Sequence, residues 1–207
     1  MAFIWINPVT DKMYEPEVLN EFLSRNGYRR FDISTDWLSI VREKYGEAVK
    51  YSLKPVLDMR CPKVVEILEE LDIASRVTFP KINPILIHCA QEGSEREDLQ
   101  EETKIITTPC QSLADLGNKL RLKDTYFIPW NRFLEKIGSA PPCNLQKSSP
   151  IPPGFFKELN VKTVSLTGEE EIRNYFEKYE LEEVELVEML YCKEGCHNGD
   201  GIKNLKK

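Results

Sequence analysis

The chain has 207 residues, of which 41% are hydrophobic and 30% are charged, and its formal net charge is -6. A chain of this length and composition can bury one hydrophobic core or two smaller ones, and it does not need additional cross-links to stay folded. The acidic balance leaves no basic field that would hold a nucleic acid backbone or an anionic membrane, so neither is expected as a partner.

The amino-terminal stretch 1–8 is apolar but short, and it lacks a basic flank. No later run approaches the roughly 18 apolar residues that span a bilayer. We therefore expect a cytoplasmic protein. The six cysteines should then remain reduced, which favours thiolate ligands or free thiols over a disulfide framework.

The first part of the chain alternates between helix and strand patterns. Apolar residues at helical spacing predict a helix over 15–25, and alternation over 29–33 predicts a strand. Residues 34–36 offer caps for a second helix, which Gly46 is expected to end. Another strand is expected within 50–59.

Cys61 stands directly before Pro62, a residue type favoured at the first helical position, so Cys61 is expected to cap a helix. The apolar run 84–88 predicts a buried strand with Cys89 at its tip. A further strand is expected at 104–108, followed by a helix. This alternation points to parallel sheets.

Prolines interrupt any regular element between residues 139 and 154, which we interpret as a linker. It separates a first lobe, 1–138, from a second lobe, 155–207. In the second lobe we expect a strand over 161–166, a helix over 168–179 and a strand over 184–190. The predicted fold is thus α/β, with two small lobes of mainly parallel sheets flanked by helices.

The last of these strands leads into the pair Cys192 and Cys196, and a glycine-rich turn follows. Cysteine thiolates are soft ligands, and the glycines allow the backbone to bend closely around a large group. The pair therefore suits an iron–sulfur cluster better than a single metal ion. Unligated or disulfide-bonded cysteines in a frayed tail are the alternative. Cys61 and Cys89 also lie at expected element ends, as a cofactor at the carboxyl edge of an α/β sheet requires.

Several short segments resemble the catalytic domain of iron-only hydrogenases, in which four cysteines hold a [4Fe-4S] cubane and one of them bridges to a two-iron centre. Residues 188–196 stand where that family has Glu-Val-Met-Ala-Cys-Pro-Gly-Gly-Cys. Residues 59–63 resemble Ser-Cys-Cys-Pro-Gly-Trp, and residues 87–91 are similar to Met-Pro-Cys-Thr-Ala-Lys. Matches at 27–32 and 106–108 keep the same order. The resemblance implies one [4Fe-4S] cluster in the cleft between the lobes, held by Cys61, Cys89, Cys192 and Cys196.

Two departures from the family pattern concern the two-iron centre. The cysteine that serves there as proton relay corresponds to Arg60, and the lysine that anchors the cofactor corresponds to Glu92. A carboxylate would repel the anionic cyanide ligands that a lysine attracts. The chain is also far shorter than a complete catalytic domain. We therefore expect electron transfer or redox sensing without hydrogen turnover.

The expected partner is a redox protein, such as a ferredoxin-like carrier or a hydrogenase-related subunit. A zinc-stabilised structural or interaction module using the same cysteines is the alternative, because four thiolates also satisfy tetrahedral zinc. A third hypothesis is an enzyme that works at an iron atom with an open coordination position in a labile cluster. The sequence identifies no substrate for such an enzyme. Cys110 and Cys143 lack family counterparts and are taken as spare. His88 and His197 flank presumed ligands and are expected to form supporting hydrogen bonds or face solvent.

Overall fold

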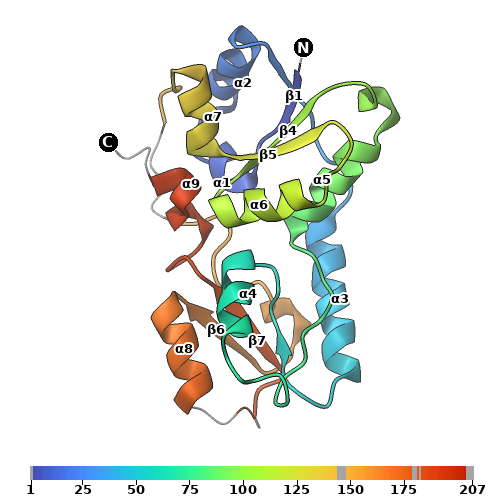
Figure 1. The fold of residues 1–207 in the computed structure, drawn as a ribbon, viewed down its shortest axis with the longest axis vertical. Helices are drawn as coiled ribbons and strands as arrows, with labels where there is room; N and C mark the ends of the chain where they lie inside the picture. Colours follow the sequence, from blue (N-terminus) through green and yellow to red (C-terminus); the bar gives the residue numbers. More distant parts are fainter. Residues whose placement is uncertain (1, 144–147, 179–180, 182, 204–207) are drawn as a thin grey trace. The chain divides into compact units, whose positions relative to one another are not determined.

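The computed structural model describes residues 2–143, 148–178, 181 and 183–203 (Figure 1). Contacts divide the chain into two compact units, each made of separate stretches. Unit 1 comprises Met1–Thr35, Leu86–Ile151 and Cys196–Lys207, and unit 2 comprises Asp36–Ile85 and Pro152–Gly195. This division differs from the consecutive lobes 1–138 and 155–207 that we expected. The chain leaves unit 1, builds part of unit 2 and returns, so distant stretches complete each sheet.

Unit 1 is built on a four-stranded parallel sheet with the order β2-β1-β4-β5. Its strands are β1 (Ala2–Trp5), β2 (Tyr28–Arg30), β4 (Lys104–Thr108) and β5 (Thr125–Pro129). Its helices are α1 (Pro8–Asp11), α2 (Pro16–Arg25), α5 (Ile85–Glu95), α6 (Gln111–Lys119), α7 (Trp130–Ile137) and α9 (Asp200–Lys203), with short turns η1 (Glu97–Leu99) and η3 (Cys196–Asn198). Two apolar clusters cover the sheet, one around Trp130 and one around Phe127.

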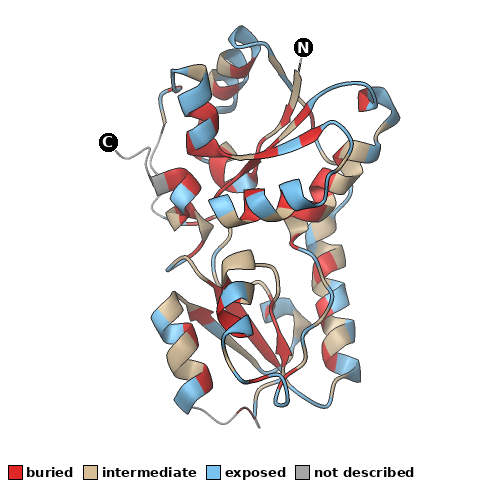
Figure 2. Cartoon of the chain, in the orientation of Figure 1, coloured by how far each residue is buried: buried red, intermediate tan, exposed pale blue. Residues whose placement is uncertain are grey.

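Unit 2 is built on a three-stranded parallel sheet with the order β3-β7-β6. Its strands are β3 (Val56–Leu57), β6 (Thr163–Thr167) and β7 (Leu186–Leu190), and its helices are α3 (Trp37–Tyr51), α4 (Pro62–Glu69), α8 (Glu169–Lys178) and the short η2 (Lys157–Leu159). All five residues of the central strand β7 are buried (Figure 2). The structure thus confirms an α/β fold with two mainly parallel sheets flanked by helices.

The predicted strand at 84–88 is wrong, because this run opens the helix α5 and Cys89 lies inside that helix rather than at a strand tip. A short apolar run has no period that separates a buried strand from a buried helix. Leu86, Ile87 and Ala90 are buried at helical spacing against the Phe127 cluster, and this packing favours the helix.

Two other expectations also differ from the structure. Helix α3 passes through Gly46 and ends at Tyr51, because Val41, Tyr45 and Val49 bury one continuous face. A Cβ at Gly46 would lie 3.2 Å from Leu159 Cδ2, so the glycine allows a close approach instead of ending the helix. The apolar stretch 1–8 contains β1, a central strand that we did not predict.

The described part of 139–154 forms neither helix nor strand, as expected for its prolines. None of the helices within the described ranges is long and apolar enough to cross a membrane.

Gly117 permits α6 to lie against β5, because a Cβ there would stand 2.3 Å from Phe127 Cδ1. We predict that Gly117→Ala lowers the free energy of unfolding by about 1–3 kcal/mol through overpacking, despite the better helix propensity of alanine. Urea unfolding measures this change. Lys119→Ala, on an exposed position of the same helix, is the control, and equal stability of the two variants would contradict the packing argument.

Candidate functional site

Two of the four proposed cluster ligands lie at the carboxyl edge of the sheet in unit 2. Strand β3 ends at Leu57 and is followed by residues 58–61, whereas the neighbouring β7 ends at Leu190 and is followed by Tyr191 and Cys192. Because both strands run in the same direction, Cys61 and the Cys192 segment meet at one edge. This edge is where ligands bind in open α/β sheets.

Cys61 is the N-cap of α4, as predicted, but its side chain makes no capping hydrogen bond. The N–H groups of Val64 and Val65 donate to the Cys61 carbonyl oxygen instead, at 3.0 Å and 3.1 Å. Burial raises the pKa of the Cys61 thiol and the charge of Asp58 adds to this shift, whereas the backbone N–H groups of Tyr191, Val64 and Lys63 oppose it. The net shift is upward, so these surroundings favour the neutral thiol in the described state.

Immediately before Cys61, a buried ionic network crosses the core of unit 2. Arg60 donates from Nε to Asp58 Oδ1 at 2.9 Å and from Nη2 to Asp58 Oδ2 at 2.7 Å, a bidentate pair. Arg60 Nη2 also lies 3.4 Å from Glu188 Oε1. The exposed fractions of the side chains are 7% for Arg60, 0% for Asp58 and 1% for Glu188. Such a pairing is the only way in which these charges can stay buried at acceptable cost.

Glu188 extends the network to a third stretch of chain. It accepts hydrogen bonds from the backbone N–H of Gly154 at 2.6 Å, from that of Phe155 at 2.8 Å and from Ser165 Oγ at 2.5 Å. The Arg60 guanidinium stacks over the ring of Phe155 at 3.8 Å and over that of Phe156 at 4.6 Å. The network therefore ties the end of β3 to β7 and to the segment that enters unit 2.

Arg60 and Glu188 both stand within the short motifs, but those motifs do not predict the contact between the two side chains. A signal was present, because Glu188 interrupts an otherwise apolar strand. A charged residue in such a run has to find a partner on burial. The sequence did not identify which of the many cations is that partner.

In unit 1, Cys89 lies in the middle of α5 and is buried, with an exposed fraction of 7%. Burial, and then the nearby charge of Glu92, raise the pKa of its thiol to about 12. Glu92 itself accepts hydrogen bonds from the backbone N–H and the hydroxyl of Ser34, each at 2.9 Å. Cys89 thus has surroundings that favour the neutral thiol in the described state.

Cys196 begins η3, and the segment that follows it packs onto the turn after β4. Gly201 donates its N–H to Pro109 O at 3.1 Å. A Cβ at Gly199 would lie 2.3 Å from Pro109 O, and one at Gly201 would lie 3.1 Å from the nitrogen of Cys110. The two glycines after the cysteine motif are therefore required for this close backbone packing. It also brings the Cys196 segment beside Cys110, which the sequence analysis took as spare.

None of the six cysteines forms a disulfide in the structure. Within the described ranges, no group of three or more His, Cys, Asp and Glu side chains is arranged to hold a metal ion. Cys61 and Cys192 share the sheet edge of unit 2, and Cys89 and Cys196 belong to different elements of unit 1. His197 is buried, and its Nε2 lies 3.3 Å from Asn198 Nδ2.

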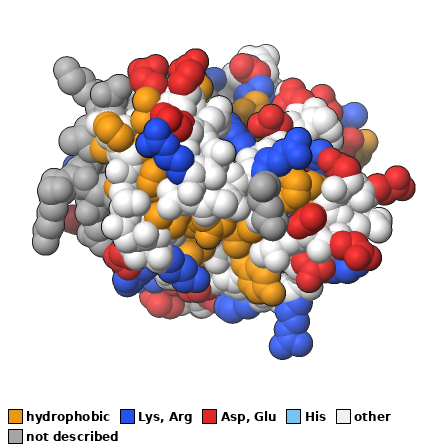
Figure 3. Space-filling view, turned by 90° about the horizontal axis from the view of Figure 1, so that it is seen from above, with side chains coloured by type: hydrophobic (Ala, Val, Ile, Leu, Met, Phe, Trp, Pro, Cys, Tyr) orange, Lys and Arg blue, Asp and Glu red, His pale blue; other side chains and the backbone are white. Residues whose placement is uncertain are grey.

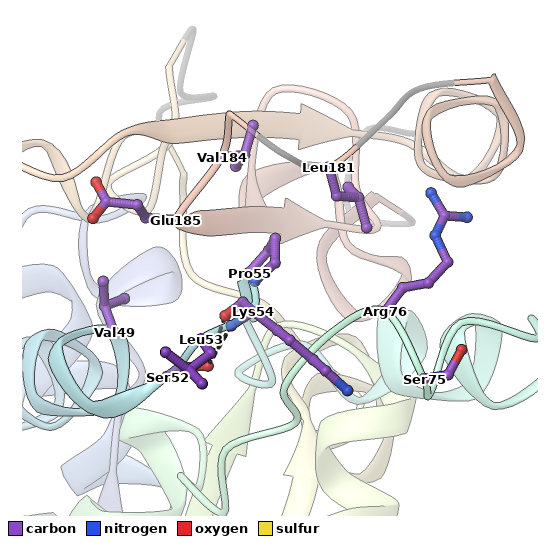
Figure 4. Close-up of a pocket in the computed structure, with 10 residues that line it drawn as sticks. All are labelled: Val49, Ser52, Leu53, Lys54, Pro55, Ser75, Arg76, Leu181, Val184 and Glu185. Carbon is purple, nitrogen blue, oxygen red and sulfur yellow. Dashed lines mark hydrogen bonds between the residues drawn. The ribbon is translucent and has the colours of Figure 1, made fainter.

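A cavity of about 580 Å³ lies at the opposite, amino-terminal end of the sheet in unit 2 (Figure 4). It is lined by Pro55, which precedes β3, and Glu185, which precedes β7, together with Lys54 and Arg76. Its cationic residues are exposed. This cavity is therefore separate from the edge that carries Cys61 and Cys192.

On the molecular face drawn in Figure 3, acidic and basic side chains are interspersed. No continuous basic field is visible on that face, which agrees with the net charge of -6.

We predict that Arg60→Met lowers the free energy of unfolding of the protein by about 3–5 kcal/mol, because it leaves two buried carboxylates without their cation. Chemical denaturation followed by circular dichroism measures the loss. Lys63→Met removes an exposed cation nearby and is the control, with a change below about 1 kcal/mol. Similar losses in the two variants would contradict the network's role.

We predict that Cys89 is alkylated more slowly than the half-buried Cys110 and Cys143 in the native protein. Because its thiol pKa is raised to about 12, the thiolate fraction and the rate should keep rising with pH over the range 7–10, without a plateau. Peptide mass spectrometry after timed iodoacetamide labelling measures the rates. A rate at Cys89 that is half-maximal near pH 9, the ordinary pKa of a cysteine thiol, would show that its pKa is not raised.

Comparison with protein-family models, with curated proteins and with solved structures finds no match for this chain. The likeness to iron-only hydrogenases therefore depends on the short motifs alone. The functional conclusion has to come from those motifs and from the residues at the sheet edge.

Proposed function

We propose that the protein binds one [4Fe-4S] cluster through Cys61, Cys89, Cys192 and Cys196 and uses it for electron transfer or redox sensing. The observation that carries the proposal is the position of Cys61 at the N-cap of α4, on the same sheet edge to which β7 leads Cys192. Hydrogen bonds to cysteine sulfur and local charge are the means by which proteins adjust such clusters.

When bound, the cluster would supply one-electron chemistry. The contribution of the protein is to hold the sulfurs and set their surroundings. Cys61 is fixed as the N-cap of α4, and the positive end of a helix dipole favours an anionic ligand there. The glycines after Cys196 keep the last ligand segment packed against Pro109.

Two features support a role without hydrogen turnover. Arg60 stands where the resembling family has its proton-relay cysteine, and its guanidinium is buried between Asp58 and Glu188. A guanidinium in that setting stays protonated and relays no proton. Glu92 stands where the family has its anchoring lysine and offers a carboxylate instead.

A redox protein is the partner that this function requires, and a ferredoxin-like carrier or a hydrogenase-related subunit would serve. We propose a cytoplasmic setting, where reduced cysteines persist. A structural zinc site using the same four thiolates is the competing assignment, and metal analysis distinguishes the two.

The test is anaerobic purification and reconstitution with iron and sulfide. We predict brown protein with about four iron and four sulfide per chain, and loss of most of this iron in Cys61→Ser and Cys192→Ser. Absorption spectra and metal analysis provide the measurement. Cys143→Ser is the matched control and should retain the cluster.

Colourless protein with one zinc and no sulfide would select the zinc module and overturn the proposal. Loss of iron in Cys110→Ser, with retention in Cys89→Ser, would keep the cluster and change its ligand set. Hydrogen uptake after loading with the two-iron cofactor would contradict the proposed lack of turnover.

A further inference from the structure

Strand β6 forms the edge of the unit 2 sheet opposite β3 (Figure 1). At its two ends, Lys162 O accepts a hydrogen bond from β7 at 3.2 Å, and Gly168 N–H donates one to β7 at 2.9 Å. Backbone groups of successive residues in a strand point alternately to the two sides of the strand within the sheet. The backbone N–H and C=O groups of Thr163, Ser165 and Thr167 therefore point away from β7.

Two other sheet edges are closed by contacts with their own chain. On the outer side of β3, Thr78 O accepts from Leu57 N–H at 3.0 Å, and Thr78 N–H donates to Pro55 O at 2.9 Å. In unit 1, the Asn118 side-chain amide binds both the N–H and the C=O of Phe127 in β5, each at 2.9 Å. Such contacts matter because an open edge is a template for pairing with another strand.

Strand β6 lacks this cover within the described ranges. Thr167 N–H donates to Glu171 Oε2 at 2.9 Å, so the last outward N–H of the strand is occupied. The outward backbone groups of Thr163 and Ser165 have no partner among the described residues, and Ser165 is exposed. The first part of this edge is therefore open to pairing.

We infer that β6 pairs antiparallel with β6 of a second copy of this chain, about a two-fold axis at Ser165. In this register Ser165 lies opposite the partner's Ser165, and Thr163 lies opposite the partner's Thr167. Hydroxyl side chains facing each other across two strands are favourable pairs. The two Ser165 residues exchange backbone hydrogen bonds, and each Thr163 N–H donates to the C=O of the partner's Thr167. Thr167 N–H keeps its own contact with Glu171.

Charge complementarity favours a second copy as the occupant of this edge. The antiparallel register places Lys162 opposite the partner's Gly168, directly before the acidic first turn of α8, which contains Glu169, Glu170 and Glu171. Lys162 and Glu170 are both exposed. The two-fold axis repeats this match at the other end, so each copy supplies one cation and one acidic turn. Opposite charges across two strands stabilise their pairing.

Sedimentation equilibrium of the full-length protein over a range of concentrations tests this inference, which goes beyond the proposed function and does not depend on a cluster. An edge strand of five residues buries little surface, so we expect a weak dimer that forms as the concentration rises. Association should stop at the dimer, because a two-fold contact uses the same edge of both copies.

Thr163→Pro removes an outward N–H and leaves the hydrogen bonds to β7 in place, since proline is tolerated where the N–H of an edge strand faces solvent. Each dimer then loses two hydrogen bonds, and we expect its dissociation constant to rise roughly tenfold to hundredfold. Thr163→Val keeps the N–H and is the matched control, with dimerisation as in the wild type. Equal dissociation constants in the two variants would overturn the inference.

A charge exchange supplies a second test that does not depend on the folding of Thr163→Pro. Lys162→Glu and Glu170→Lys each place like charges together and should each weaken the dimer, roughly tenfold. The two substitutions in one chain should restore the wild-type dissociation constant, which general destabilisation would not do. Unchanged dissociation constants in both single variants would overturn the inference.

Amide hydrogen exchange shows where the copies pair. Exchange at Thr163 and Ser165 should slow as the concentration rises, whereas exchange at Thr167 should stay constant, because its N–H is already bonded to Glu171. Protein that stays monomeric up to about 1 mM, or that associates beyond the dimer, would contradict the inference. Neither result affects the proposed function, which metal analysis tests separately.

Discussion

The interaction on which unit 2 depends is the pairing of Arg60 with Asp58 and Glu188 in the absence of solvent. It joins the end of β3, the central strand β7 and the segment around Phe155, which are distant in the sequence. Each charge would be costly to bury alone, so the three side chains are stable only as a set. The backbone continues from Arg60 directly into Cys61, the N-cap of α4.

Opposing effects meet at the Cys61 sulfur. Burial and the charge of Asp58 raise the pKa of the Cys61 thiol, and the backbone N–H groups near it oppose that shift only in part. A cluster or metal ion would add positive charge and shift this balance towards the bound thiolate.

Local patterns predicted those elements whose signals are local. The helical spacing over 15–25, the strand at 104–108 and the capping role of Cys61 before Pro62 are confirmed. The apolar run 84–88 has no periodicity that distinguishes a buried strand from a buried helix. Its packing against Phe127 favours the helix. The interleaved units and the contact of Arg60 with Glu188 are products of long-range pairing, which no local window contains. The ligand set stays a prediction from short motifs.

The central claim is that four cysteines of this chain bind an iron–sulfur cubane. X-ray absorption at the iron and zinc edges of anaerobically purified protein tests it most directly. The account predicts an iron signal with a sulfur shell and a second shell of neighbouring iron atoms. A zinc signal with sulfur neighbours alone, or no bound metal after reconstitution, would contradict it.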